Sequence, residues 1–598
     1  MCDIFWNNFE EKFQDVKESF DQSAMISVDC ELTGLHSFEE YRPSLFDSGA
    51  ERYEKLKAGV NQLLVIQLGV TTFCLSREED RYVARTFTFY LLPTSFLSVD
   101  TRFICQASSL CFLSCAGFDF NKLFSEGIPY LSPQQERKLR LDLQRGRPAL
   151  ACNLSSDLRS VLERACWQVS QWAPSALPGQ SFKIHPYPEQ KLDEVDEENS
   201  ILDASMPPSL TTLLRELLLH RELRLNFPDI WTYSEDGSVL RIEKIRYEER
   251  IQLEREEETK VKEEYGNVVN EDIDVDCLAE KAIQLLLGAT KIFHLLVNAK
   301  KPIIGHNCLL DLMVLLKQFY CPLPEKYKDF KKVIHRIFPE IYDTKFISFE
   351  VKAQNFRGPK FFRCTQNNTS KLVRIDRELW EINSLPSIYS FFHSTKGLEL
   401  TKDAIRVEKG LGADPTSGDK RFHDAGWDSY CTGFCFIRLG HLKAIIGKSS
   451  SCSQGIGAGE YLRELVDFRN CVNLMQARSP YLKLDGEDPN NFRPPLLHIE
   501  SRKDPINITK VKWMLSAYGS VDVKKCSTYC ATIAAMSENC YCTILKAFSY
   551  RDDYCVTKMK SCTQSKISLM LHAIIAATAT GITILTLRNF RSRAGLST

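Results

Sequence analysis

Three short acidic segments lie far apart in this chain, and a fold that uses them together must bring them to one place. The first segment, 26–34, is an apolar run that carries Asp29 and Glu31. The second, 305–311, follows another apolar run, and the third, 423–428, precedes a helical pattern. Asp29 and Glu31 are two positions apart, so on a strand both carboxylates point to the same face. The segments therefore predict an α/β fold in which a strand and two helices share one site.

Four carboxylates and one histidine form the candidate catalytic set: Asp29, Glu31, Asp311, His423 and Asp428. Carboxylate and water oxygens are the ligands that Mg²⁺ and Mn²⁺ prefer. Without cations, clustered carboxylates would repel and raise one another's pKa. Two metal ions can hold both the attacking and the leaving oxygen of a displacement at phosphorus, and a nearby histidine can take the proton of the attacking water. The set predicts hydrolysis of a phosphodiester that depends on two Mg²⁺ or Mn²⁺ ions.

Composition limits the function less than these motifs do. The 598 residues suggest several domains, and 44% hydrophobic residues suffice for a sizeable core. Lys plus Arg (76) nearly balances Asp plus Glu (77), so any basic path for RNA must be local. The acidic N-terminus does not resemble a secretory signal, so most of the 22 cysteines are expected to be reduced and buried.

The segment Ile567–Leu587 contains no charged residue and is flanked by lysines and arginines. About 20 apolar residues in a helix can cross a bilayer. A buried core helix is the alternative interpretation. We favour a transmembrane tail anchor that leaves the rest of the chain facing the cytosol. Its modest hydrophobicity and short basic tail indicate the mitochondrial outer membrane, with the endoplasmic reticulum membrane as the rival destination.

Changes in composition divide the chain further. We expect a nuclease domain in two parts, 1–180 and 276–446, interrupted by a small domain and a charged helix at 181–275. Residues 404–418 are expected to form a glycine-containing loop. Near the C-terminus, residues 490–556 show strand-like and helical patterns in an order that predicts a small βαββαβ unit.

The acidic segments resemble the Exo I, Exo II and Exo III motifs of the DEDD 3′-exonucleases of the histidine (DEDDh) type. Other segments resemble the poly(A)-specific ribonuclease family: Cys105–Ser109, Gly117–Lys122, Gly127–Leu131, Lys301–Asn307, Gln318–Pro324 and Asp343–Lys345. The resemblance implies an RNase H-like core, an inserted domain named for an Arg-x-x-x-His signature and a C-terminal RRM-like unit. It also implies a homodimer as a possible state.

The family's roles transfer to the matching positions of this chain. The four carboxylates would bind two metal ions, and His423 would be the general base. Leu32 and Leu35 would lie near the terminal nucleotide. Lys345 would contact a phosphate, and a solvated lysine is the alternative. The implied activity is 3′→5′ hydrolysis of RNA that releases 5′-nucleoside monophosphates.

Two departures from the family put the appended RNA-binding units in doubt. Arg215 and His220 are five positions apart rather than four, and the strand Tyr529–Ile533 lacks the aromatic run that stacks bases. Together with the tail, these departures favour the anchored branch of the family, the piRNA trimmers. That branch implies PIWI-bound piRNA precursors as substrate, with a PIWI protein and a Tudor-domain scaffold as partners. The alternatives are a membrane-bound poly(A) deadenylase and a catalytically weak RNA-binding scaffold.

Overall fold

The computed structural model describes residues 2–35, 42–76, 81–152, 154, 156–185, 207–235, 239–265, 274–357, 361–366, 369–374, 379–380, 382–410, 422–447, 458–489 and 494–559. The predicted membrane span at 567–587 lies outside these residues. The chain forms two compact units. The larger unit comprises 1–42, 53–473 and 481–487, and the smaller comprises 43–52, 474–480 and the chain from residue 488 onward.

A nine-stranded mixed sheet forms the centre of the larger unit, in the order β1-β4-β3-β2-β10-β11-β15-β16 with β14 paired to β4. The strands are β1 (Cys2–Ile4), β2 (Met25–Leu32), β3 (Val65–Ser76), β4 (Arg81–Tyr90), β10 (Ile303–Gly305), β11 (Ile341–Asp343), β14 (Arg406–Lys409), β15 (Cys471–Asn473) and β16 (Tyr481–Lys483). Strands β2, β3 and β4 are antiparallel, whereas β10 runs parallel to both β2 and β11. The loop expected at 404–418 is wrong for residues 406–409, because they pair with β4.

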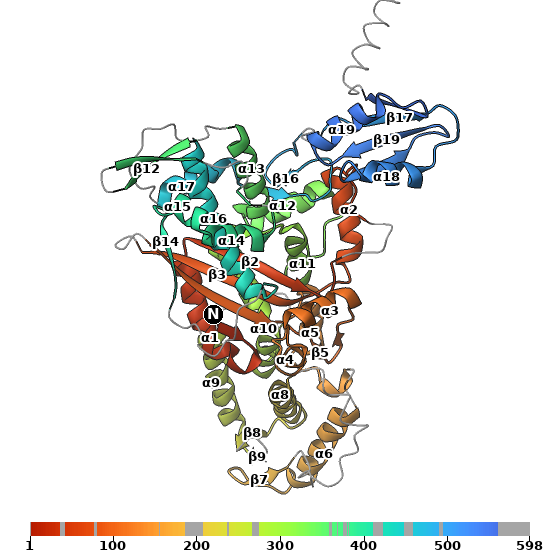
Figure 1. Cartoon of the computed structure of the whole chain (residues 1–598). Helices are drawn as coiled ribbons and strands as arrows, with labels where there is room; N and C mark the ends of the chain where they lie inside the picture. The colour runs from red at the N-terminus through yellow and green to blue at the C-terminus, as the bar shows by residue number, and fades with distance from the viewer. Residues whose placement is uncertain are drawn as a thin grey trace, which may run out of the picture. The chain divides into compact units, whose positions relative to one another are not determined.

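Helices cover both faces of this sheet (Figure 1). One face carries α1 (Trp6–Gln22), α10 (Cys277–Ala299) and α11 (Leu309–Phe319), and the other carries α13 (Thr344–Arg357), α14 (Leu385–His393) and α16 (Ala425–Gly447). On the second face, apolar side chains of these helices pack on buried strand residues such as Phe73 and Tyr82. The predicted α/β class is confirmed.

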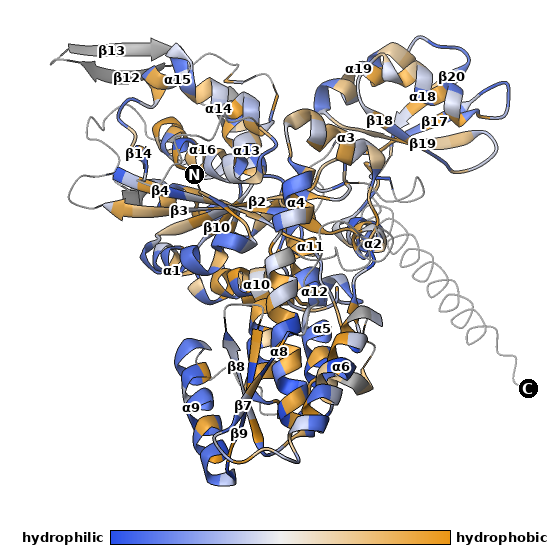
Figure 2. Ribbon diagram, turned by 90° about the horizontal axis from the view of Figure 1, so that it is seen from below, coloured by the Kyte–Doolittle hydropathy of each residue, from blue (hydrophilic) through white to orange (hydrophobic). Residues whose placement is uncertain are grey.

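Helix α10 is long and apolar enough to cross a membrane, and among the described residues it alone passes that test. Most of it is buried, and Figure 2 shows its hydrophobic ribbon between other helices of the unit. The helix is broken at Gly288, where φ is 29° and a Cβ would lie 2.2 Å from the carbonyl oxygen of Pro129. This break lets the chain at Pro129 approach the helix backbone, so α10 is a core helix.

The inserted unit predicted at 181–275 contains β7 (Ser181–Ile184), α8 (Pro208–Asn226), β8 (Ile230–Glu235), β9 (Val239–Lys244) and α9 (Tyr247–Tyr265). Helix α6 (Ser156–Trp172) precedes these elements and shares their hydrophobic core. Its strands form an antiparallel sheet in the order β7-β9-β8. His220 and Arg224 lie one turn apart on α8 and both bond the Thr232 hydroxyl, at 2.6 and 2.8 Å. Arg224 also lies 3.5 Å over the Trp231 ring. His220 of the imperfect signature and the neighbouring Arg224 are therefore buried within the unit.

The remaining elements of the larger unit connect these layers. They are α3 (Ala107–Ala116), α4 (Phe120–Glu126), α5 (Pro133–Asp142), α12 (Tyr327–Ile337), α15 (Thr395–Leu400) and α17 (Ala458–Leu465), with the short strands β5 (Ser95–Phe96) and β6 (Val99–Asp100) and the hairpin β12 (Phe361–Gln366) and β13 (Thr369–Arg374). Helix α2 (Gly49–Val60) spans the boundary between the two units.

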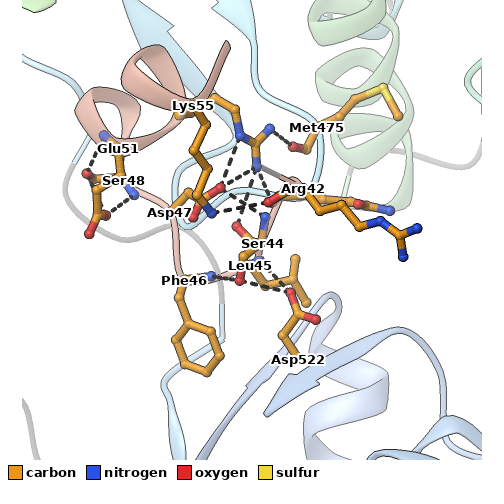
Figure 3. Close-up of polar contacts among 12 residues, drawn as sticks. Arg42, Ser44, Leu45, Phe46, Asp47, Ser48, Glu51, Lys55, Met475 and Asp522 are labelled. Atoms are coloured by element: carbon orange, nitrogen blue, oxygen red, sulfur yellow. Dashed lines mark hydrogen bonds and ion pairs between the residues drawn. The ribbon is translucent and has the colours of Figure 1, made fainter. Parts of the chain in front are cut away.

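The smaller unit has the βαββαβ order that the sequence predicts. Its elements are β17 (Leu497–Ser501), α18 (Ile508–Ser516), β18 (Val521–Lys525), β19 (Cys530–Ala535), α19 (Glu538–Phe548) and β20 (Tyr554–Lys558), and the sheet order is β18-β19-β17-β20. The segment 43–52 joins this unit although it is distant in sequence. The Asp522 carboxylate accepts hydrogen bonds from the Ser44 hydroxyl and the Leu45 N–H (Figure 3). Within the same segment, Arg52 pairs with Asp47.

Candidate active site

Strand β2 presents Asp29 and Glu31 as predicted, and the strand beside it leaves room for a helix. Across the antiparallel pair β2–β3, Asp29 lies opposite Gly69 and Glu31 lies opposite Gln67. A Cβ on Gly69 would come within 1.8 Å of the Ala425 carbonyl oxygen. The first turn of α16 therefore rests on the backbone of β3, directly across from Asp29.

A second glycine completes this close approach. A Cβ on Gly426 would lie 2.1 Å from the Thr88 hydroxyl of β4. The helix thus meets β3 and β4 at two positions without side chains, and Asp428 follows within its first turn. Where the start of a helix packs this closely on strands, a side chain would not fit, so both positions require glycine.

The second segment is held in place by the buried carboxylate of Asp343, at the end of β11. Its oxygens accept the N–H groups of Asn307 at 2.8 Å, Cys308 at 3.3 Å, Lys345 at 3.0 Å and Asn473 at 3.0 Å. The Asn307 backbone has a φ of 61°, a left-handed conformation that Asn adopts more readily than most residues. This turn leads into α11, whose first turn carries Asp311.

The five predicted residues come together at this edge of the sheet. One ligand atom each from Glu31, His423 and Asp428 lies within 4.8 Å of the others. The charges of Asp428, Asp311 and Glu31 all act on Asp29. Five residues from three distant segments thus form one cluster, as the sequence predicts.

Burial raises the pKa of every carboxyl group in the cluster, and repulsion from neighbouring carboxylates adds to this rise. The pKa of Asp29 lies well above its usual range, because burial and then the Asp428 charge oppose ionisation. Burial, followed by repulsion from Asp428 and Asp311, raises the pKa of Glu31 to about 9. Burial also raises the pKa of Asp311 and of Asp428 to about 7.

The donor set fits divalent cations of the hard class. Asp428 Oδ1 is buried and accepts no hydrogen bond from the described residues, so its lone pairs have no donor there. A carboxylate in that state is costly unless a cation or a proton neutralises it. Oxygen ligands of this kind suit Mg²⁺ or Mn²⁺.

His423 lies in the turn before α16 and has a φ of 74°. Its backbone N–H donates to Asp428 Oδ2 at 3.0 Å, and its ring contacts Phe112 edge to face with centroids 4.5 Å apart. Partial burial lowers the pKa of its imidazole below the ordinary value. The ring is therefore mostly neutral at pH 7 and able to accept a proton.

The three residues predicted to contact the substrate differ in how far they are exposed. Leu32 is buried at the end of β2, whereas Leu35 is 50% exposed and its N–H donates to the Gln106 side chain at 3.0 Å. Lys345 lies at the start of α13, where burial lowers the pKa of its ammonium and the Asp343 carboxylate opposes that shift. We did not predict roles for Gln67, Gly69 or Asp343, because each acts through the pairing of strands that are distant in sequence.

Comparison with known proteins places the chain in a family. A family model described as CAF1 family ribonuclease matches residues 4–436. The chain belongs to the CAF1 ribonuclease family, a family of 3′→5′ exoribonucleases, and the predicted enzyme class is confirmed.

Curated relatives narrow this class. The chain is 32% identical over 561 residues to the pre-piRNA 3′-exonuclease trimmer of Bombyx mori, and the match covers 93% of each chain. It is 28% identical over 509 residues to the poly(A)-specific ribonuclease PNLDC1 of Mus musculus, covering 84% of this chain and 83% of that protein. It is also 28% identical over 532 residues to the poly(A)-specific ribonuclease PARN of Homo sapiens, covering 87% and 74%. The predicted resemblance to the poly(A)-specific ribonuclease family is confirmed.

Proposed function

We propose that this ribonuclease trims the 3′ ends of piRNA precursors. The observation that carries the proposal is the 32% identity to a pre-piRNA 3′-exonuclease trimmer along 93% of the chain, joined to an intact carboxylate cluster. The substrate would be the 3′ end of an RNA bound by a PIWI protein. A Tudor-domain scaffold would bring the two proteins together, because the appended units lack clear RNA-binding signatures.

The cluster supports a mechanism with two Mg²⁺ or Mn²⁺ ions, held by Asp29, Glu31, Asp311 and Asp428. When bound, the ions would stabilise the charge on the attacking and leaving oxygens. His423 would accept the proton of the attacking water, since its imidazole is largely neutral at pH 7. Leu32 and Leu35 would contact the terminal nucleotide, and Lys345 would contact a phosphate. The products would be 5′-nucleoside monophosphates.

The location of the chain is also part of the proposal. The uncharged segment 567–587 and its basic flanks support a tail anchor in the mitochondrial outer membrane, with the catalytic unit facing the cytosol.

The βαββαβ unit would be an RRM-like module. Residues facing opposite to its helices include His498, Thr532 and Ala534, without the aromatic pair that stacks bases. We propose that it contacts protein rather than RNA, and that a homodimer forms as in the resembled family.

A poly(A) deadenylase is the second candidate, because PNLDC1 and PARN are named poly(A)-specific ribonucleases. Purified full-length protein in detergent should be given free oligo(A) and a PIWI-loaded precursor with a mixed 3′ sequence. We expect faster trimming of the loaded precursor, and none by the Asp29→Ala variant. Strong preference for oligo(A) would favour the deadenylase, whereas RNA binding without trimming would favour a scaffold.

In cells, removal of residues 567–598 should release the protein from mitochondria and lengthen piRNA 3′ ends.

A further inference from the structure

Gln67 occupies a special position in the sheet, between the acidic strand and the helix that carries Asp428. It pairs with Glu31 on one side and with Tyr90 on the other. Two positions further along β3, Gly69 pairs with Asp29. Directly opposed residues on antiparallel strands have Cα atoms about 4.5–5.5 Å apart. The two β3 residues opposite Asp29 and Glu31 are therefore immediate neighbours of the cluster.

The Gln67 side chain bonds the start of α16. Its Oε1 accepts the N–H of Ala425 at 2.9 Å, and the side chain is 1% exposed. The same side chain lies toward the Tyr90 hydroxyl of the paired strand and opposes the rise in pKa that burial causes there, so its donating end is the one near that hydroxyl. An amide has one accepting end and one donating end, and the accepting oxygen is the end that faces Ala425. Tyr90 is itself held by stacking on Phe5, with centroids 4.5 Å apart.

Ala425 lies between the two functional residues of its segment. His423 precedes it by two positions, and Asp428 follows by three. The first N–H groups of a helix have no partner within the helix, and here a side chain of β3 supplies one. Since the His423 N–H donates to Asp428 Oδ2, the turn and the helix start move as one piece.

We propose that Gln67 is a positioning residue, which sets His423 and Asp428 relative to Glu31 through the Ala425 N–H. Gly69 is its steric counterpart, because it admits the same turn against the strand. On β3, Gln67 and Gly69 thus lie opposite Glu31 and Asp29 of β2. The catalytic consequence rests on the proposed hydrolytic function, whereas the structural consequence for the turn does not.

The test replaces Gln67 by leucine, which has a similar size and no acceptor. With saturating Mg²⁺ and RNA, kcat of Gln67→Leu should fall about tenfold, since a buried N–H loses its partner and the base and metal ligand shift. The KM for RNA should stay within about twofold, because Gln67 bonds the start of the helix that carries Asp428. Hydrogen exchange of the peptide 422–430 should become faster. Tyr90→Phe, which keeps the stacked ring, should change the rate and the exchange in the same direction by about threefold.

Gln284→Leu is the matched control, because Gln284 is another buried glutamine whose amide bonds Glu280 at 2.8 Å, away from the cluster. It should leave kcat per folded molecule and exchange at 422–430 unchanged. The proposal is overturned if Gln67→Leu and Tyr90→Phe show wild-type exchange at 422–430, or if Gln284→Leu lowers kcat equally. If Gln67→Leu does not fold, Tyr90→Phe decides. Exchange needs no RNA cleavage, so an inactive wild type would count against the proposed function and not against this role.

Discussion

Two regions of the chain neutralise their carboxylates in opposite ways. Around the inserted unit, Asp276 pairs with Arg221, Glu257 pairs with Arg224, and Glu280 pairs with Arg140. At the edge of the main sheet, the charges nearest to Asp29 are those of other carboxylates. Buried charges without partners are strongly unfavourable. The first region is therefore complete as folded, whereas the second is complete only with cations or protons.

The arginine region has a further consequence for function. Arg221 donates to three backbone carbonyls, of Leu143, Gln144 and Arg147, in addition to its ion pair. Arg224 is bonded to Thr232 and Glu257 and stacked on Trp231. Such side chains hold the inserted unit together. Their charges are compensated locally and do not form a basic surface for RNA.

The largest expected effect comes from Asp29→Asn, which removes one charge from the uncompensated cluster. RNA hydrolysis at saturating Mg²⁺ should fall by about a thousandfold or more, because charge held at the metals contributes several kcal/mol to the transition state. The metal-free protein should become more stable, because an amide at this position carries no charge and does not have to take up a proton on folding, as the buried Asp29 carboxyl must. Cleavage assays and thermal unfolding in EDTA measure the two effects. Lower stability in EDTA would contradict the picture of an uncompensated cluster.

Asp276→Asn makes the matching change in the compensated region. The amide still caps α10, where the Asp276 side chain accepts the Ala279 N–H at 2.9 Å. Loss of the charge leaves Arg221 buried without its partner and should reduce the free energy of unfolding by about 2 kcal/mol. Hydrolysis per folded molecule should be unchanged. Chemical denaturation followed by activity of the folded fraction provides the comparison, and a gain in stability would show that the ion pair is not favourable.

The dependence of stability on pH should differ between metal-free and metal-loaded protein. The pKa values of Glu31 at about 9 and of Asp311 and Asp428 at about 7 exceed those of unfolded carboxyl groups. The native state therefore binds more protons, so the metal-free protein should lose stability as pH rises from about 4.5 to about 9. Bound Mg²⁺ should remove most of this loss. Thermal unfolding from pH 5 to pH 8.5, with EDTA or Mg²⁺, checks the sign. Asp428→Asn should flatten the EDTA curve.

The sequence was sufficient for the cluster itself but not for its surroundings. Asp29, Glu31, Asp311, His423 and Asp428 could be predicted because metal chemistry restricts their residue types and their local patterns. Gln67 and Asp343 could not, because their roles depend on which strands become neighbours. The same limit explains the strand at 406–409, since its polar residues Arg406, Glu408 and Lys409 show little apolar alternation and form a strand only by pairing with β4.

The smallest effect should come from the exposed rim of the arginine region. Arg145 is about half exposed and pairs with Asp274 at 2.9 Å and Glu258 at 3.7 Å. An exposed pair is screened by water and costs side-chain entropy, so Arg145→Ala should change the free energy of unfolding by no more than about 0.5 kcal/mol. Urea denaturation at low and high salt measures it, with Asp276→Asn as the buried counterpart. A loss comparable to that of Asp276→Asn would mean that the arginines stabilise the unit as one network. The burial of an individual ion pair would then not be enough to distinguish charges that stabilise the fold from charges that bind a cation.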